Sequence, residues 1–145
     1  MTFKHILIPT DGSEVSRRAI ATGVSLAAEE HAKVTGVYVG DIPSLATIET
    51  NPQQFAREMA QARTTARQNL GQVERAAREA GVECETYFDE ENRSVPDAIA
   101  HITRQSHCDL VVMGTNGRRG LAALLNPSNA KAVAKHLEIP VLVVH

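Results

Sequence analysis

The chain has few cysteines and few aromatic residues: two of its 145 residues are cysteine, none is tryptophan, and aromatic residues make up 3%. Cys84 and Cys108 provide neither the paired spacing of a zinc site nor a disulfide framework. No apolar run is long enough for a membrane-spanning helix. The apolar run near the N-terminus ends in turn residues rather than in a signal-peptide cleavage site. We therefore expect a cytoplasmic protein without a membrane partner.

A surplus of charge of either sign is also missing. There are 15 lysines and arginines against 17 aspartates and glutamates, which gives a net charge of -2 and a pI of about 6.3. A nucleic-acid-binding face, or a segment that binds anionic lipid, would need an excess of cations. We therefore expect small-molecule or protein partners and no nucleic acid. The length and the 43% hydrophobic content fit one globular domain over residues 1–145.

Short apolar or β-branched runs alternate with segments of helical period along the whole chain. We expect strands over 3–9, 32–39, 82–88, 108–114 and 140–145. We expect helices from the "TDGS" turn to Ala28 and over 53–80, 95–106 and 128–137, with 40–52 as a connecting loop that has room to act as a lid. Parallel strands need a crossover each time, so this alternation predicts an α/β fold, a three-layer, doubly wound, five-stranded parallel sheet.

Several residues mark the ends and the buried faces of these elements. The helix over 53–80 is the clearest, because its apolar residues recur every three or four positions, and Gly81 ends it. In the first helix the predicted buried face is Val15, Ala19, Val24, Ala27 and Ala28. Ser94 is the predicted N-cap of the helix that follows it. The alternating polarity of 82–88 predicts an edge strand.

Two turns follow strands at the places where such sheets bind ligands. "PTDGS" follows the first strand and "GTNGRRG" follows the fourth. In an open parallel sheet, ligands bind beyond the carboxyl ends of the strands, where the winding changes direction. Glycine in such a turn lets backbone N–H groups approach a phosphate. If the two strands are neighbours, the two turns face one crevice.

Three separated motifs, in this order, resemble the universal stress protein family: "ILIPTDGSEVSRRAI" over 6–20, "LVVMGTNGRRGLAALL" over 110–125 and "IPVLVV" over 139–144. The order of elements also resembles that family over essentially the whole chain. The resemblance implies the strand order 3-2-1-4-5, which puts the first and fourth strands side by side. It also implies a cytoplasmic homodimer joined through the C-terminal strand. The family has ATP-binding and non-binding groups, so the resemblance leaves the ligand open.

The family's ATP signature is a glycine, two residues, a glycine, nine residues, and a glycine followed by serine or threonine. Gly114 and Gly117 match it, whereas Pro127 stands in place of the third glycine, before Ser128. The aspartate that corresponds to Asp11 lies in the nucleotide pocket of ATP-binding relatives. The cofactor-binding residues that the resemblance implies are Pro9, Thr10, Asp11, Val39, Met113, Gly114, Gly117, Pro127, Ser128 and Asn129, with Val39 and Met113 on the adenine side.

The binding free energy that is lost because Pro127 replaces a glycine can be estimated. A glycine N–H bound to a phosphate oxygen contributes about 1.5–3 kcal/mol, so its loss weakens binding roughly tenfold to hundredfold. Proline also pushes the preceding residue, Asn126, toward an extended conformation. The N–H groups of Ser128, Asn129 and Ala130 are expected to remain available to an anion at the start of the helix. Asp11 is a candidate to accept ribose hydroxyls or to help hold magnesium beside ATP.

Each of these residues also has a purely structural interpretation. Asp11 is a good turn or helix-cap residue, Gly114 and Gly117 suit a tight turn, and Ser128 suits a helix cap. Arg118 and Arg119 are expected in solvent. The six histidines show no ligand spacing, so no metal site is predicted.

Three functions follow from these observations. The first is a universal stress protein that binds ATP or a related adenine nucleotide as a regulatory ligand. The second is a nucleotide-free dimeric adaptor of the same fold, which Pro127 favours. The third is an enzyme, but the chain has no dinucleotide fingerprint after its first strand and no P-loop. Catalysis beyond slow ATP hydrolysis is therefore not expected.

Overall fold

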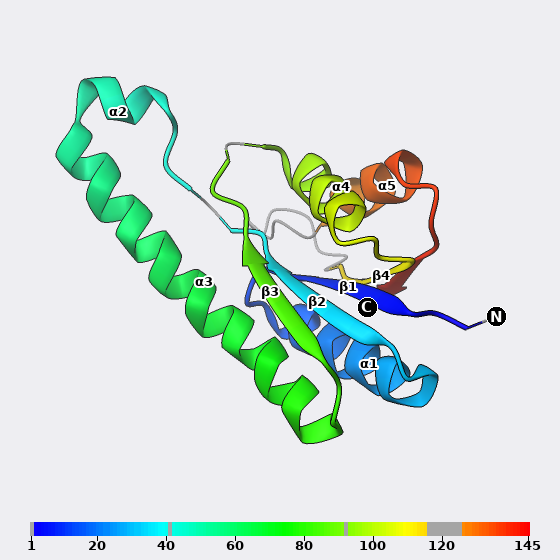
Figure 1. The fold of residues 1–145 in the computed structure, drawn as a ribbon. Coiled ribbons are helices and arrows are strands. Elements are labelled where there is room, and N and C mark those ends of the chain that lie inside the picture. Colours follow the sequence, from blue (N-terminus) through cyan, green and yellow to red (C-terminus); the bar gives the residue numbers. More distant parts are fainter. Residues whose placement is uncertain (1, 41, 92, 116–125) are drawn as a thin grey trace.

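Five parallel strands form one sheet in the order β3-β2-β1-β4-β5 (Figure 1). The computed structural model describes residues 2–40, 42–91, 93–115 and 126–145. The strands are β1 (His5–Thr10), β2 (Lys33–Tyr38), β3 (Cys84–Phe88), β4 (Leu110–Gly114) and β5 (Val141–Val144). The predicted fold class and strand order are confirmed, and β1 and β4 are hydrogen-bonded neighbours.

The helices cover both faces of the sheet. They are α1 (Glu14–Glu30), α2 (Ala46–Thr50), α3 (Pro52–Ala80), α4 (Val95–Gln105) and α5 (Pro127–His136). α1 and α3 lie on one face, and α4 and α5 lie together on the other (Figure 1). The first half of α3 and the short α2 extend beyond the sheet. No helix in the described ranges is long and apolar enough to cross a membrane.

Alternate residues of the central strands supply two separate hydrophobic cores. On β1, Ile6 and Ile8 face α1, whereas Leu7 faces α4 and α5. On β4, Val112 joins the first cluster and Met113 joins the second. A strand that is buried on both faces needs apolar residues at every position. This explains why the first and fourth strands are continuous apolar runs in the sequence.

The predicted helix ends at Ser94 and Gly81 are confirmed. Ser94 caps α4 by accepting the N–H of Asp97, and Ser13 caps α1 by accepting the N–H of Ser16. Gly81 ends α3 with φ +70°, a left-handed conformation that glycine adopts without steric cost. On the edge strand β3, the half-buried Cys84 alternates with the exposed Glu85, as predicted.

Two details of the sequence prediction are wrong. The segment expected to be a structureless loop contains α2, a helix of five residues with no buried side chain. It was missed because a helix that packs no apolar face leaves no hydrophobic period in the sequence. Ala28, assigned to the buried face of α1, is exposed. It directly follows the buried Ala27, and consecutive helical residues point about 100° apart.

Candidate functional site

The turn after β1 is held by hydrogen bonds around Asp11. Its Oδ1 atom accepts the hydroxyl of Ser16 at 2.7 Å and the N–H of Ser13 at 2.9 Å. Its own N–H donates to the Ser16 hydroxyl oxygen at 3.3 Å. Asp11 therefore fixes the start of α1 while it stands at the carboxyl end of the strand. Its structural role as a turn residue is confirmed, and the cap itself is Ser13.

Thr10 and Gly12 shape the same turn. Thr10 is fully buried, and its hydroxyl oxygen accepts the N–H of Gly12 at 3.2 Å. Gly12 has φ +84°, which favours glycine. The carbonyl of Thr10 also accepts the N–H of Val39 at 2.9 Å. The ends of β1 and β2 are thus tied together where a ligand would meet the sheet.

Gly114 ends β4 against the first turn of α1. A Cβ atom at this position would lie 2.5 Å from the carbonyl oxygen of Val15 and 2.8 Å from its carbonyl carbon. The glycine is therefore required by packing, whatever else it does. Gly117, Arg118 and Arg119 lie outside the described residues.

Val39 and Met113 lie on the α4 and α5 side of the sheet and are almost fully buried. They share a hydrophobic cluster with Ala130, in the first turn of α5. By the alternation of β1, Pro9 has its side chain on the same face as Leu7, which belongs to this cluster. Three of the predicted pocket residues are therefore on one face of the sheet, next to the start of α5.

The start of α5 differs from the prediction. Asn126 has the expected extended backbone, with φ −98° and ψ 168°, and it is the N-cap in place of Ser128. Its side-chain oxygen accepts the N–H of Asn129 at 2.8 Å, and its carbonyl accepts the N–H of Ala130 at 3.0 Å. The expectation that both N–H groups are available to an anion is therefore wrong. A proline at the first helical position suits helix entry but supplies no donor.

Ser128 is consequently the main donor left at this helix end. It is exposed, and the second residue of a helix has no intrahelical acceptor for its N–H. Its N–H and hydroxyl are therefore the groups in the described first turn of α5 best placed to meet an anion. Pro127 is also exposed, which leaves the first turn accessible.

Thr115 is a candidate that the sequence analysis missed. It follows β4 directly, is 3% exposed, and its hydroxyl has no hydrogen-bond partner among the described residues. Its N–H donates to the carbonyl of Val144, which holds the backbone in the strand pattern. Two residues after Met113, its side chain lies on the α4 and α5 face. A buried hydroxyl without a partner is costly, and nothing in the sequence distinguishes it from a satisfied threonine.

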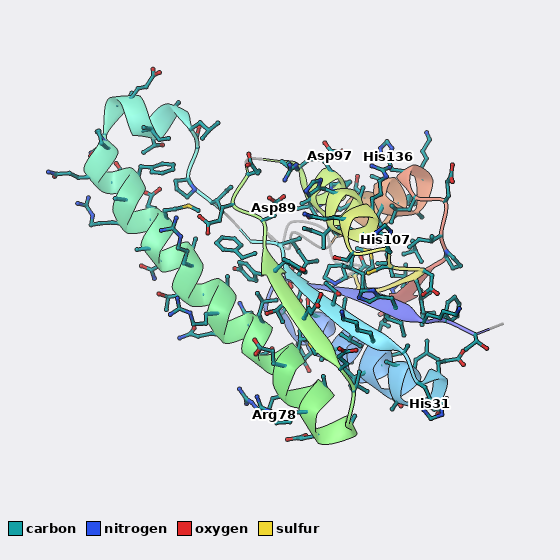
Figure 2. All side chains as sticks on the ribbon, in the orientation of Figure 1. His31, Arg78, Asp89, Asp97, His107 and His136 are labelled. Atoms are coloured by element: carbon teal, nitrogen blue, oxygen red, sulfur yellow. The ribbon has the colours of Figure 1, made fainter. Side chains whose placement is uncertain are left out.

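No metal centre or reactive thiol accompanies these residues in the described ranges. No group of three or more histidine, cysteine, aspartate or glutamate side chains there can hold a metal ion. His31 follows α1, whereas His107 and His136 lie near α4 and α5 (Figure 2). Burial raises the pKa of the Cys84 thiol to about 11 and that of Cys108 to about 12. Neither thiol is a good nucleophile near neutral pH.

The family is decided by comparison with known proteins. A model described as "Universal stress protein family" matches residues 2–145. The chain belongs to the universal stress protein family. Universal stress protein MJ0531 of Methanocaldococcus jannaschii is 35% identical over 144 residues, which cover 98% of this chain and 82% of that protein.

Solved structures confirm the fold of this universal stress protein. The structure of hypothetical protein MJ0577 has a TM-score of 0.77 and 21% identity, covering 99% of this chain and 96% of that one. A universal stress protein in complex with cAMP has a TM-score of 0.67 and 22% identity, over 100% and 99% of the two chains. One from Archaeoglobus fulgidus in complex with dAMP has a TM-score of 0.67 and 20% identity, over 100% of both chains.

Proposed function

We propose that this universal stress protein binds ATP or a related adenine nucleotide as a regulatory ligand, at the carboxyl ends of β1, β2 and β4. The observation that carries the proposal is the buried, partnerless hydroxyl of Thr115 at the end of β4. A ligand that accepts or donates a hydrogen bond there removes the cost of leaving that group unpaired. The nucleotides bound by two of its structural neighbours, cAMP and dAMP, support the choice of an adenine ligand.

The positions of the other residues suggest how the nucleotide lies. Asp11 stands at the end of β1 and accepts ribose hydroxyls. The buried side chains of Val39 and Met113 pack behind the surface that the adenine contacts. The phosphates lie toward the N–H and hydroxyl of Ser128 at the positive end of α5. Pro9, Thr10, Gly114, Gly117 and Asn129 complete the proposed site. Magnesium, where present, neutralises phosphate charge near Asp11.

A nucleotide-free adaptor is the second candidate, and the start of α5 favours it. Pro127 has no N–H, and Asn126 already accepts the N–H of Asn129. Two donors that an anion would use are thereby missing from the first turn. On this alternative the protein acts through protein contacts alone, and the partnerless Thr115 hydroxyl remains unexplained.

Both candidate functions, nucleotide binding and the nucleotide-free adaptor, include a homodimer and a cytoplasmic location. β5 is an edge strand of the sheet, and Leu142 on it is 42% exposed. An apolar edge strand pairs readily with another strand, and pairing of two identical edges about a two-fold axis closes the assembly. We infer that two copies associate through β5.

The test begins with mass spectrometry of nucleotides released from freshly purified protein. ATP is then titrated by calorimetry into the wild type and into Pro127→Gly, with Pro52→Gly as the matched control. Pro52 is also the first residue of a helix, α3, but it is remote from the strand ends. We expect wild-type binding that Pro127→Gly tightens and Pro52→Gly leaves unchanged. Absence of binding by every form at millimolar ATP would refute the proposal, and binding by Pro127→Gly alone would assign this protein to the adaptor group.

A further inference from the structure

The edge strand β3 lies at the opposite end of the sheet from β5, and its outer side pairs with no strand among the described residues. The hydrogen bond from the Val34 N–H to the Glu83 carbonyl fixes which backbone groups face β2. Backbone groups alternate in direction along a strand, so the N–H and C=O groups of Cys84, Thr86 and Phe88 point away from β2. β3 therefore presents a row of backbone donors and acceptors to which another strand can pair.

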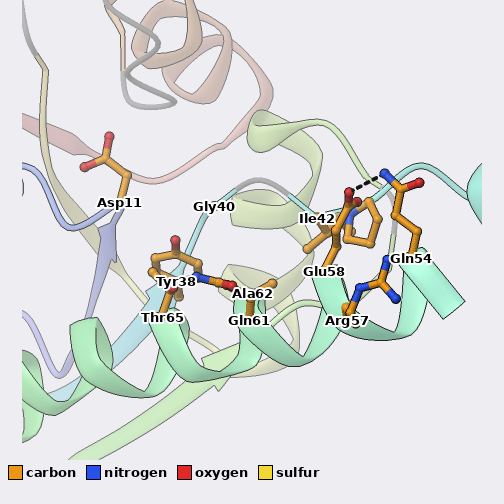
Figure 3. Close-up of a pocket in the computed structure, with 11 residues that line it drawn as sticks. Asp11, Tyr38, Gly40, Ile42, Gln54, Arg57, Glu58, Gln61, Ala62 and Thr65 are labelled. Atoms are coloured by element: carbon orange, nitrogen blue, oxygen red, sulfur yellow. Dashed lines mark hydrogen bonds between the residues drawn. The ribbon is translucent and has the colours of Figure 1, made fainter.

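One face of β3 is covered by α3. The ring of Phe88 contacts Tyr38 edge to face, with centroids 5.6 Å apart, and Tyr38 packs with Ala66 and Leu70 of α3. Farther along, Tyr38 and Ala62 line a hollow of about 830 Å³ between the end of β2 and α3 (Figure 3). The β3 side chains on this face, at positions 84, 86 and 88, are half-buried. An added strand would extend this partly apolar face beside α3.

The other face of β3 is open. The hydrophobic cluster under α4 and α5 contains residues of β1, β2, β4 and β5, and among the described residues none of β3. Glu85 and Tyr87 lie on this face by the alternation of the strand. The Glu85 side chain is 47% exposed, and Tyr87 is 40% exposed. β3 thus has an open edge and an open face together.

β3 and the loop after it are strongly acidic. Residues 83–91 carry five carboxylates and no cation, although the whole chain has a net charge of only -2. The five are Glu83, Glu85, Asp89, Glu90 and Glu91. Cations of other segments pair with three of them: Lys33 with Glu85, Arg63 with Glu90, and Arg93 with Asp89. Within the described ranges Glu83 and Glu91 make no ion pair, so this edge attracts a basic partner.

The carboxylate of Asp89 lacks one hydrogen-bond donor. Asp89 follows β3 directly, and Figure 2 shows it between the end of β3 and α4. By the alternation of the strand it shares the face of Glu85 and Tyr87. Its side chain is 8% exposed. Oδ1 accepts the N–H of Glu91 at 3.1 Å and a guanidinium N–H of Arg93 at 2.8 Å. Oδ2 is buried and has no partner among the described residues, and a charged donor satisfies such an oxygen best.

The same charges disfavour a second copy as the occupant of this edge. Two β3 edges paired with each other would bring two acidic segments together, and like charges opposite each other on paired strands are destabilising. In a basic strand, alternate cations would lie beside Glu85 and on the ring of Tyr87. The residues between them would lie beside Cys84, Thr86 and Phe88, where apolar side chains fit. The edge therefore favours a segment in which basic and apolar residues alternate.

We propose that β3 is a docking edge for a basic, extended segment of another protein, which pairs with the outward backbone groups of Thr86 and Phe88 and donates from a lysine or arginine to Asp89. In docking by strand addition, main-chain hydrogen bonds give affinity and alternate side chains give specificity. The docking edge is remote from β5, and it does not depend on nucleotide binding at the strand ends.

The test is NMR of the ¹⁵N-labelled full chain without nucleotide, titrated with a capped peptide of about six residues, the length of an ordinary strand, that alternates arginine or lysine with valine. We expect slower hydrogen exchange of the Thr86 and Phe88 amides, which the peptide covers. The amides of Glu85 and Tyr87 face β2 and should not change. A peptide with glutamate at the basic positions should not bind. The basic peptide with methylated backbone nitrogens should bind at least tenfold more weakly, because it cannot form the ladder.

A pair of variants tests the role of Asp89. Asp89→Asn should weaken binding of the basic peptide about tenfold, the effect of losing one hydrogen bond to a charged group. Asp97→Asn removes an exposed carboxylate in the first turn of α4 and should leave binding unchanged. Thermal unfolding of both variants checks that they are folded.

Three results would overturn the proposal: unchanged exchange of the Thr86 and Phe88 amides, equal binding of the methylated peptide, or equal binding by Asp89→Asn and Asp97→Asn. Equal binding of the methylated peptide would indicate a charged surface only. Exchange of the Thr86 amide that slows with protein concentration, without peptide, would assign the edge to a second copy and would also overturn it. Absence of ATP binding in a separate titration would leave these results unchanged.

Discussion

Gly114 and Val15 approach so closely that a side chain on Gly114 would have its Cβ atom 2.5 Å from the Val15 carbonyl oxygen. The contact joins the end of β4 to the first turn of α1, and Asp11 stabilises that same turn through Ser16 and Ser13. The turn after β1 and the end of β4 are therefore connected through the start of α1. Packing by itself therefore requires a glycine at the first position of the ATP signature.

Gly114→Ala should destabilise the protein by about 1–3 kcal/mol, because helix backbone must move to admit the methyl group. Gly71→Ala is the matched control. Gly71 lies within α3 with nothing near its missing Cβ, so alanine should stabilise by about 0.5–1 kcal/mol. Urea unfolding of both variants measures the two effects. Equal stability of Gly114→Ala and the wild type would contradict the packing argument.

Thr115→Val should have opposite effects on stability and on binding. Valine has nearly the shape of threonine and removes a buried hydroxyl without a partner, so the free energy of unfolding should rise by about 1 kcal/mol. Nucleotide affinity should fall, because the ligand loses a hydrogen bond. Thermal unfolding and calorimetric titration measure the two changes. A variant that is less stable, or that binds ATP as the wild type does, would exclude this role for the hydroxyl.

Leu142→Lys should convert the proposed dimer into a monomer. The charge is placed on the exposed edge of β5, where a second copy would have to desolvate it. Tyr87→Lys is the control, because Tyr87 is 40% exposed on the opposite edge strand, β3. Light scattering should give a dimer for the wild type and for Tyr87→Lys, and 15.7 kDa for Leu142→Lys. A monomeric wild type would refute association through β5.

His5 should make the protein less stable in mild acid. Burial, followed by the positive charge of Lys33, lowers the pKa of His5 below its ordinary value of 6.5. The unfolded chain therefore takes up a proton first, and stability is lost as the pH falls from 6.5 toward the lowered pKa of the folded state. Unfolding free energies at pH about 7.5 and about 5.5 should differ more in the wild type than in His5→Gln. Equal differences would show that His5 does not contribute.

The local features of the fold were predictable because each depends on neighbouring residues. Ser13 and Ser94 cap the helices they precede, and Gly81 takes the left-handed conformation that ends α3. The apolar runs of β1 and β4 predicted that these two strands lie in the centre of the sheet, since burial on both faces requires apolar residues at every position. α2 was missed because no side chain of that helix is buried.

The sequence by itself determined the alternation of strands and helices, the buried central strands and the family to which the motifs point. Only the tertiary structure decided that the cap at Asn126 occupies the Asn129 N–H, that Thr115 is left without a partner, and that a hollow opens beside α3. The physical reason is that secondary structure and turns depend on residues a few positions apart. Whether a polar group is satisfied, or a surface hollowed, depends on elements that meet only after the chain has folded.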